Sequence, residues 1–258
     1  MYIDTHTHLY LEEFDCDGQE NAVDNAVEAG VDHMIFPNVD LTTIDRMKRL
    51  HEARPDVTSM AMGFHPTEVD DGWKESVGRI EEELRTSHES SYVAVGEIGI
   101  DLYWDKTYAE QQMQAFERQC ALAEKLSLPV IIHCREGLDA TLEVLGEFPA
   151  LRGVMHSFGG TAADVERTLS VNGNMLFGIN GIVTFKNSRL RESLPAITTG
   201  RMLLETDSPY LAPVPFRGRR CESAMLPYTA AHIASSLGIT PEALAEATTA
   251  NAHRLFGV

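Results

Sequence analysis

Paired cysteines are missing from this 258-residue sequence. It has four cysteines, and none shows the spacing of a zinc finger or a redox motif. They are Cys16, Cys120, Cys134 and Cys221. A chain of this length does not need disulfides to stabilise its fold, so we expect free thiols.

Long apolar runs are also missing. No stretch approaches the roughly 18 consecutive apolar residues that a membrane-spanning helix needs. The chain begins directly with a short apolar strand and two histidines, without the basic and apolar segments of a secretory leader. We therefore expect no membrane partner and a cytoplasmic location.

Positive charge is scarce. The sequence has 21 lysines and arginines against 39 aspartates and glutamates, which gives a formal net charge of −18. Such a charge repels the phosphates of a long nucleic acid, so we expect no extended duplex-binding surface. A DNA end or a small phosphodiester is still permitted as a partner, because bound metal cations would attract it locally.

The pattern of apolar residues alternates along the chain. Short apolar or β-branched runs recur between stretches of helical periodicity, which is typical of parallel βα units. The eight runs lie near Tyr2–Thr5, Asp32–Pro37, Thr58–Gly63, Tyr92–Glu97, Val130–His133, Gly153–His156, Met175–Gly178 and Met202–Glu205. The expected helices lie near 19–30, 41–54, 74–86, 107–127, 138–147, 161–172, 187–197, 224–238 and 241–254.

This alternation predicts a (βα)8 TIM barrel, an α/β fold of one domain over residues 1–258. An open doubly wound sheet is the alternative. That fold rarely has eight strands in one uninterrupted series, and its GxGxxG fingerprint is missing after the first run.

His6 and His8 stand two residues apart on or just beyond the first strand, so both side chains point to the same face. In a barrel that face is the interior. Two imidazoles on one rigid element suit Zn²⁺ or a similar divalent metal. A coincidental pair of polar core residues is the weaker interpretation, because His is rarely buried in pairs without a partner.

Four more candidate ligands fall at strand ends, where barrel enzymes carry their catalytic residues. Glu97, His133 and His156 close the fourth, fifth and sixth runs, and Asp207 follows the eighth. Each alone has a structural explanation as a satisfied core histidine, a buried ion pair or a helix N-cap. Together with the first two histidines, they bury more ionisable surface than a core tolerates without a metal.

Six ligands exceed the three or four that one tetrahedral zinc takes from protein, which predicts two divalent ions sharing a carboxylate. Glu97 is the expected bridge. The first two histidines would share Glu97 and Asp207 on one ion, and the two later histidines would share Glu97 on the other. Asp207 would also accept a proton from the attacking water. Mixed His and carboxylate sites accept Mg²⁺, Mn²⁺ or Zn²⁺, so the sequence does not fix the metal.

The one dense basic cluster of the sequence follows the eighth run. It contains Arg217, Arg219 and Arg220, which either grip a substrate phosphate or lie on the surface paired with acids such as Glu222. Lys186 is a further phosphate candidate.

Two other charged residues share strand faces with candidate ligands. Arg135 follows His133 by two positions and is a candidate to steer substrate. Glu205 precedes Asp207 by two positions and is a candidate to contact substrate or to orient a ligand histidine. The alternative is that Arg135 and Glu205 form one buried ion pair.

Seven segments carry more specific motifs. They are DTHTHL at the start, GFHP at 63–66, VGEIGID at 95–101, LPVIIHCRE at 128–136, GIVTFKN at 181–187, LLETDSPYLAPVPFRGRR at 203–220 and NAHRLFG at 251–257. With these motifs the chain resembles, nearly end to end, the TatD family of metal-dependent deoxyribonucleases, within the amidohydrolase-like metallohydrolase barrels.

The resemblance implies a hydrolase that cleaves phosphodiester bonds of DNA from an end, in the manner of a 3′-5′ exonuclease, with a hydroxide that bridges two metals. The matching ligand positions are His6, His8, Glu97, His133, His156 and Asp207. His65, in the GFHP motif, matches a substrate-phosphate contact, unless it only fixes the loop before Pro66.

The chain departs from the family's pattern at three places. Ser157 stands where a cysteine is common, and Cys221, Glu222 and Ser223 replace a commoner Arg-Asn-Glu-Pro segment. The seventh strand, LFGINGIV, is also a variant. No ligand is lost, but the altered loop after the eighth run leaves the choice of substrate open.

Other functions suit parts of the same pattern. A carbonyl substrate would make the chain an ester or amide hydrolase, such as a D-aminoacyl-tRNA deacylase, with the same ligands. A barrel kept only for binding would have lost a ligand. Serine and thiol nucleophiles lack support, because there is no GxSxG elbow and strand alternation turns Cys134 away from the interior. Tyr103 and Trp104 are expected near the mouth, but the aromatics are too few and scattered for a base-stacking platform.

Overall fold

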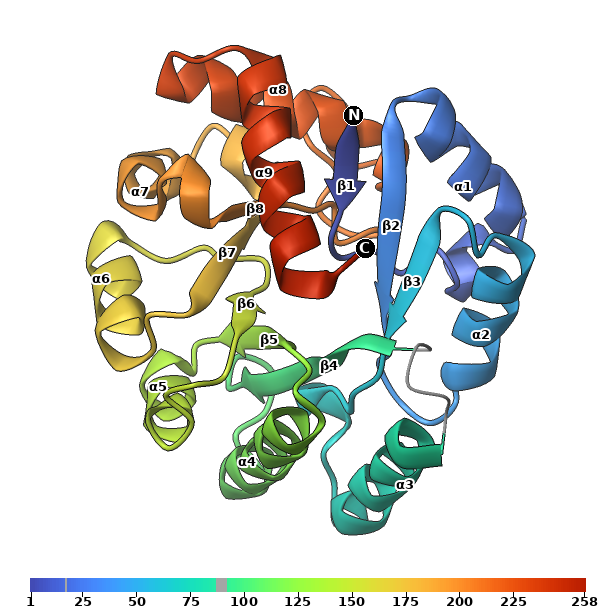
Figure 1. Cartoon of the computed structure of the whole chain (residues 1–258), viewed down its shortest axis with the longest axis vertical. Coiled ribbons are helices and arrows are strands. Elements are labelled where there is room, and N and C mark those ends of the chain that lie inside the picture. The colour runs from blue at the N-terminus through green and yellow to red at the C-terminus, as the bar shows by residue number, and fades with distance from the viewer. Residues whose placement is uncertain (17, 87–91) are drawn as a thin grey trace.

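In the described part of the chain, eight strands form one sheet in which each strand pairs in parallel with the next (Figure 1). The computed structural model describes residues 1–16, 18–86 and 92–258. The strands are β1 (Tyr2–Asp4), β2 (Val31–Pro37), β3 (Thr58–Ala61), β4 (Tyr92–Asp101), β5 (Val130–Arg135), β6 (Gly153–Met155), β7 (Met175–Ile179) and β8 (Met202–Leu204). The prediction of a (βα)8 barrel is confirmed.

Backbone hydrogen bonds join the segment that follows β1 to the end of β8 and to the segment that follows β8. The N–H of Thr5 donates to the carbonyl of Leu204 at 3.0 Å, and the N–H of Asp207 donates to the carbonyl of His6 at 2.9 Å. The ring of strands therefore closes beside two of the candidate ligands.

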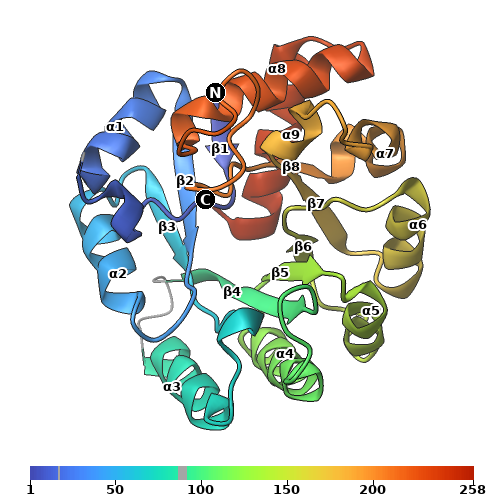
Figure 2. The same ribbon diagram turned by 180° about the vertical axis from the view of Figure 1, so that it is seen from behind.

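Helices alternate with the strands and surround them (Figures 1 and 2). They are α1 (Gln19–Glu28), α2 (Ile44–Ala53), α3 (Trp73–Thr86), α4 (Ala109–Leu126), α5 (Leu138–Gly146), α6 (Ala162–Val171), α7 (Leu190–Ile197), α8 (Leu226–Leu237) and α9 (Pro241–Phe256). These nine helices of the described residues all lie where the sequence predicts helices, with ends that differ by a few residues. Within the described ranges, no helix is both long enough and apolar enough to cross a membrane.

One apolar side chain from each strand fills the interior of the barrel. These residues are Ile3, Ile35, Ala61, Ala94, Ile131, Val154, Leu176 and Leu203. Helix α9 packs Ala252, Leu255 and Phe256 against them and lies across that end of the barrel (Figure 1). The interior is thus sealed at the amino ends of the strands, and the carboxyl ends form the face on which the candidate ligands stand.

Strand β4 is longer than the sequence predicts. We expected it to end at Glu97, but it continues for four more residues to Asp101. Its register against β5 shifts between Val95 and Ile98. Ala94 and Glu97 are three positions apart and both point inward, which regular alternation forbids, so this irregularity turns Glu97 into the barrel. The extension also brings Asp101 to the carboxyl rim.

The seal at the amino end of the barrel gives a stability prediction. Phe256 is 6% exposed, and its replacement by alanine leaves a cavity, so we expect the free energy of unfolding to fall by about 3–5 kcal/mol. Urea unfolding followed by circular dichroism measures this change. Val27→Ala on α1 is the control, because Val27 is 37% exposed, and it should stay within about 0.5 kcal/mol of wild type. Equal unfolding curves for Phe256→Ala and wild type would contradict the sealing role of α9.

Candidate metal centre

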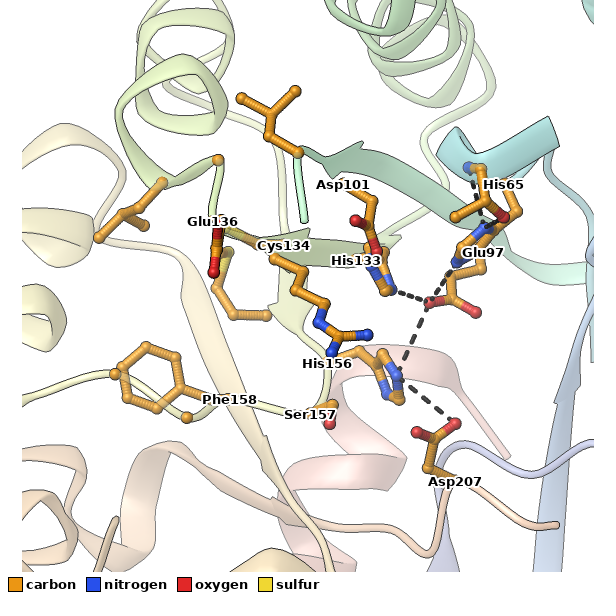
Figure 3. Close-up of a pocket in the computed structure, with 18 of the residues that line it drawn as sticks. His65, Glu97, Asp101, His133, Cys134, Glu136, His156, Ser157, Phe158 and Asp207 are labelled. Carbon is orange, nitrogen blue, oxygen red and sulfur yellow. Dashed lines mark hydrogen bonds and ion pairs between the residues drawn. The ribbon is translucent and has the colours of Figure 1, made fainter. Parts of the chain in front are cut away.

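All six predicted ligands meet at the carboxyl ends of the strands, five of them in the wall of an open pocket of about 1270 Å³. Figure 3 labels four of these five, which are Glu97, His133, His156 and Asp207. His6 is fully buried just behind that wall. The six come from β4, β5 and the turns after β1, β6 and β8. Residues separated by up to about two hundred positions in sequence are therefore held on one rigid rim.

One group of donor atoms faces the segment after β1. The Nε2 atoms of His6 and His8 lie 3.0 Å apart. Glu97 Oε2 lies 3.2 Å from the first and 3.7 Å from the second of these nitrogens. Asp207 Oδ1 lies 3.8 Å from both. These four atoms belong to the residues that the sequence assigns to the first ion.

A second group surrounds the other oxygen of Glu97. Its Oε1 lies 2.9 Å from His133 Nδ1, 3.4 Å from His65 Nε2 and 3.6 Å from His156 Nε2. Figure 3 shows these side chains pointing toward Glu97 from different elements. His65, which the sequence suggests as a phosphate contact, thus lies as close to Glu97 as the predicted ligands do.

A tyrosine fixes the proton of His8. The Nδ1 atom of His8 lies 2.8 Å from the hydroxyl of Tyr10, and that hydroxyl donates its one proton to the carbonyl of Pro37. The hydroxyl must therefore accept from His8, which places the imidazole proton on Nδ1 and leaves the Nε2 lone pair free toward the pocket. Tyr10 is fully buried, so the arrangement is rigid.

Two carboxylates hold the outward nitrogens of the later histidines. Asp101 Oδ2 accepts from His133 Nε2 at 2.8 Å. Glu205 Oε1 lies 3.1 Å from His156 Nδ1 and accepts the Ser157 N–H at 2.6 Å. Such outer contacts orient metal-ligating imidazoles and raise their basicity.

Gly178 on β7 makes room for Glu205. A Cβ atom at this position would meet Glu205 Oε2 at 2.0 Å. Any larger residue would therefore push the carboxylate away from His156. The departure of the seventh strand from the family's pattern leaves this space intact.

The pKa values of the histidines in the cluster reflect the negative charge of the carboxylates around them. Burial lowers the pKa of His6 well below its usual range and that of His8 to about 4, so both are neutral. Burial also opposes charge on His133 and His156, but neighbouring carboxylates outweigh it and raise their pKa values to about 9 and about 10. Burial raises the pKa of Asp207 to about 7. Two imidazolium groups thus supply the positive charge that the buried carboxylates require.

These residues fit divalent cations. Three groups of imidazole and carboxylate donors each lie within 4.8 Å of one another, namely His6, His8 and Glu97; His6, His156 and Glu205; and His65, Glu97 and His133. Within the described part of the chain, the buried Nδ1 of His6 has no hydrogen-bond partner. Nitrogen and oxygen donors of this kind suit Zn²⁺, Mn²⁺ and related ions.

The other predicted contacts divide into two sets. Arg135 lines the pocket, whereas Glu205 is 1% exposed beneath His156 and forms no ion pair with Arg135 in the described structure. Arg217 and Arg219 are not among the described residues that line the pocket, and the first stacks over Phe185.

The rest of the basic cluster lies apart from the site as well. Arg220 pairs with Glu222 at 2.8 Å. This agrees with the alternative in which the basic cluster pairs with nearby acids and does not grip a substrate phosphate. Lys186 is not among the described pocket-lining residues.

Sequence reasoning missed Tyr10 and Asp101. The motif at 95–101 carries a signal for Asp101, since Glu97, Gly99 and Asp101 alternate along one strand face. Nothing local marks Tyr10, because its partner Pro37 lies on another strand.

Comparison with known proteins identifies the family of this chain. The sequence profile described as TatD related DNase matches residues 3–257. The chain belongs to this family. It is 37% identical over 261 residues to an uncharacterized metal-dependent hydrolase, YabD of Bacillus subtilis, and the match covers all of both chains. It is 33% identical over 246 residues to the 3′-5′ ssDNA/RNA exonuclease TatD of Erwinia billingiae, covering 92% of each.

A solved structure agrees with the sequence relatives. The crystal structure of YjjV, a TatD homologue of Escherichia coli, superposes with a TM-score of 0.90 at 28% identity and covers 100% of this chain and 98% of its own. These matches confirm the resemblance to the TatD family that the sequence motifs indicate.

The contact of Tyr10 with His8 predicts an effect on metal affinity. Tyr10→Phe removes the acceptor for His8 Nδ1, so we expect affinity for Zn²⁺ or Mn²⁺ to fall by about 10- to 100-fold. Calorimetric titration of EDTA-treated protein measures this directly. Tyr228→Phe makes the same chemical change at a site that is 48% exposed and should leave affinity unchanged. Equal affinities for Tyr10→Phe and wild type would overturn the assignment.

Asp101 predicts a pH dependence in metal-free protein. Its carboxylate helps to raise the folded-state pKa of His133 from 6.5 to about 9, so this contribution to stability is complete below about pH 6.5 and is lost as pH rises through 9. We expect Asp101→Asn to destabilise the protein more at pH 6 than at pH 9.5. Urea unfolding in EDTA at both pH values measures the difference. A constant effect across this range would show that charge on His133 is not involved.

Proposed function

We propose that this TatD-family chain is a divalent-metal-dependent nuclease that hydrolyses phosphodiester bonds at the 3′ end of single-stranded DNA or RNA. The observation that carries the proposal is the position of Glu97, whose two oxygens face two separate groups of imidazole nitrogens at the floor of an open pocket. The name of the Erwinia billingiae relative, a 3′-5′ ssDNA/RNA exonuclease, supports the choice of bond and substrate.

We assign two ions to the two groups. His6, His8 and Asp207 would hold one ion with Glu97 Oε2, and His133, His156 and His65 are the candidates for the other with Glu97 Oε1. Zn²⁺, Mn²⁺ and Mg²⁺ all remain candidates, because the donor set combines nitrogen and oxygen. When bound, such ions polarise a phosphoryl oxygen and lower the pKa of water.

The chain's own residues supply the remaining functions. Glu97 is 3% exposed and is held by imidazoles on both sides, so it fixes the centre of the site. Asp207 lines the pocket with a side chain that is 14% exposed, so it is placed to take a proton from an attacking water. A general base of this kind typically contributes about 10²- to 10⁴-fold to the rate.

The shape and charge of the molecule favour an end over a long duplex. The formal net charge of −18 opposes extended contact with phosphates. Among the described residues that line the pocket, the arginines are Arg135 and Arg167, and the second pairs with Asp139 and Asp164. Contact with a short single-stranded segment needs no larger basic surface.

Activity assays test this function. We expect EDTA to abolish cleavage of a 5′-labelled single-stranded oligonucleotide, and Glu97→Gln and Asp207→Asn to lower kcat by at least about 10²-fold. Glu242→Gln, at an exposed carboxylate on α9, is the matched control. Circular dichroism shows whether the variants fold.

Full nuclease activity in a folded Glu97→Ala or Asp207→Ala protein would sink the proposal. The same panel includes a D-aminoacyl-tRNA and simple esters. Faster hydrolysis of these carbonyl substrates than of DNA or RNA ends would replace the nuclease with the ester or amide hydrolase that the ligands also permit.

A further inference from the structure

Two exposed aromatic side chains stand beside the metal centre. Trp104 is 72% exposed and lines the pocket, and Tyr103 next to it is 48% exposed. Their ring centroids lie 4.8 Å apart in an edge-on arrangement. Exposing two large adjacent aromatic rings to water is unfavourable, and such surfaces mark sites of ligand contact.

An arginine completes this surface. The guanidinium carbon of Arg135 lies 3.7 Å from the centroid of Tyr103 and 5.2 Å from that of Trp104. No carboxylate of the described residues lies within ion-pair distance of Arg135, although the chain is strongly acidic. The aromatic rings therefore hold this cation in place while its charge stays available to a substrate phosphate.

The strands fix the aromatic surface relative to the metal centre. Asp101 on β4 pairs in register with Arg135 on β5. The Oδ1 atom of Asp101 accepts the N–H of Tyr103 at 3.0 Å, while its Oδ2 atom accepts from His133 at 2.8 Å. One buried carboxylate thus orients a candidate metal ligand and the loop that carries both aromatic residues.

We propose that Tyr103, Trp104 and Arg135 form a stacking subsite for an unpaired nucleobase adjacent to the phosphodiester at the metal centre. The inference rests on the proposed nuclease function and identifies how that site holds its substrate. Every nucleobase offers an aromatic face, so the subsite accepts different sequences but requires a base that is free of its own strand partner. The sequence predicts no stacking platform, because its aromatic residues are few and scattered. Arg135 lies more than thirty positions from Tyr103 and Trp104, and the strand register brings it to them.

A substrate without bases tests the subsite. The substrate pair consists of two oligothymidylates of equal length, one of them with abasic residues at its last three positions. We expect Trp104→Ala to raise KM for the normal strand by about 5- to 150-fold, the value of one stacked base, and to leave KM for the abasic strand within about twofold of wild type. Wild type should prefer the normal strand by a similar factor. Trp104→Phe should retain most of this preference.

Tyr228→Ala is the control for the comparison of the two strands. Tyr228→Ala removes an aromatic ring that is 48% exposed and lies outside the described pocket lining, so both KM values should match wild type. Equal cleavage of the two strands by wild type would overturn the proposal. An equal rise in KM for both strands in Trp104→Ala would also overturn it, because such a rise would indicate a structural role for Trp104.

Fluorescence separates the subsite from the nuclease activity. The chain has two tryptophans, and Trp73 is 5% exposed, so quenching by an added strand reports on Trp104. We expect the normal strand to quench emission, the abasic strand to quench much less, and Trp104→Phe to lose the effect. Quenching without cleavage would refute the nuclease and keep the subsite. Cleavage without quenching would refute the subsite alone.

Discussion

The buried carboxylate of Glu97 is the interaction on which the rest of the site depends. It is 3% exposed, and each of its oxygens faces a different set of imidazole nitrogens. An isolated carboxylate in such surroundings costs several kcal/mol, so positive charge has to accompany it. Protonated His133 and His156 provide that charge when no cation is bound, and divalent ions can replace it.

The barrel turns this requirement into a fixed geometry. Apolar side chains from every strand and from α9 fill the barrel at the amino ends of the strands. This close packing holds the strands in fixed positions, so the residues at their carboxyl ends are held too. At the carboxyl end, the irregularity of β4 turns Glu97 inward, and hydrogen bonds between the segments after β1 and β8 bring His6 and Asp207 together. Tyr10 then orients the neighbouring imidazole from outside the cluster.

Sequence periodicity predicted the barrel, its helices and the residues of the cluster, because those depend on local alternation and on strand ends. It failed where contacts between strands decide. The continuation of β4 to Asp101 depends on a register shift against β5. The contact of Tyr10 with His8 depends on the hydrogen bond that the Tyr10 hydroxyl donates to the carbonyl of Pro37 on β2. The basic cluster after β8 suggested substrate contacts, but Arg217 stacks on Phe185 and Arg220 pairs with Glu222.

A crystal structure with anomalous scattering at the absorption edge of Zn or Mn tests whether Glu97 joins two metal sites. We expect two metal peaks per chain, one on each side of Glu97, with one carboxylate oxygen directed at each. A single peak, or two peaks that do not share Glu97, would show that Glu97 is not the bridge, even if the protein proved to be a nuclease.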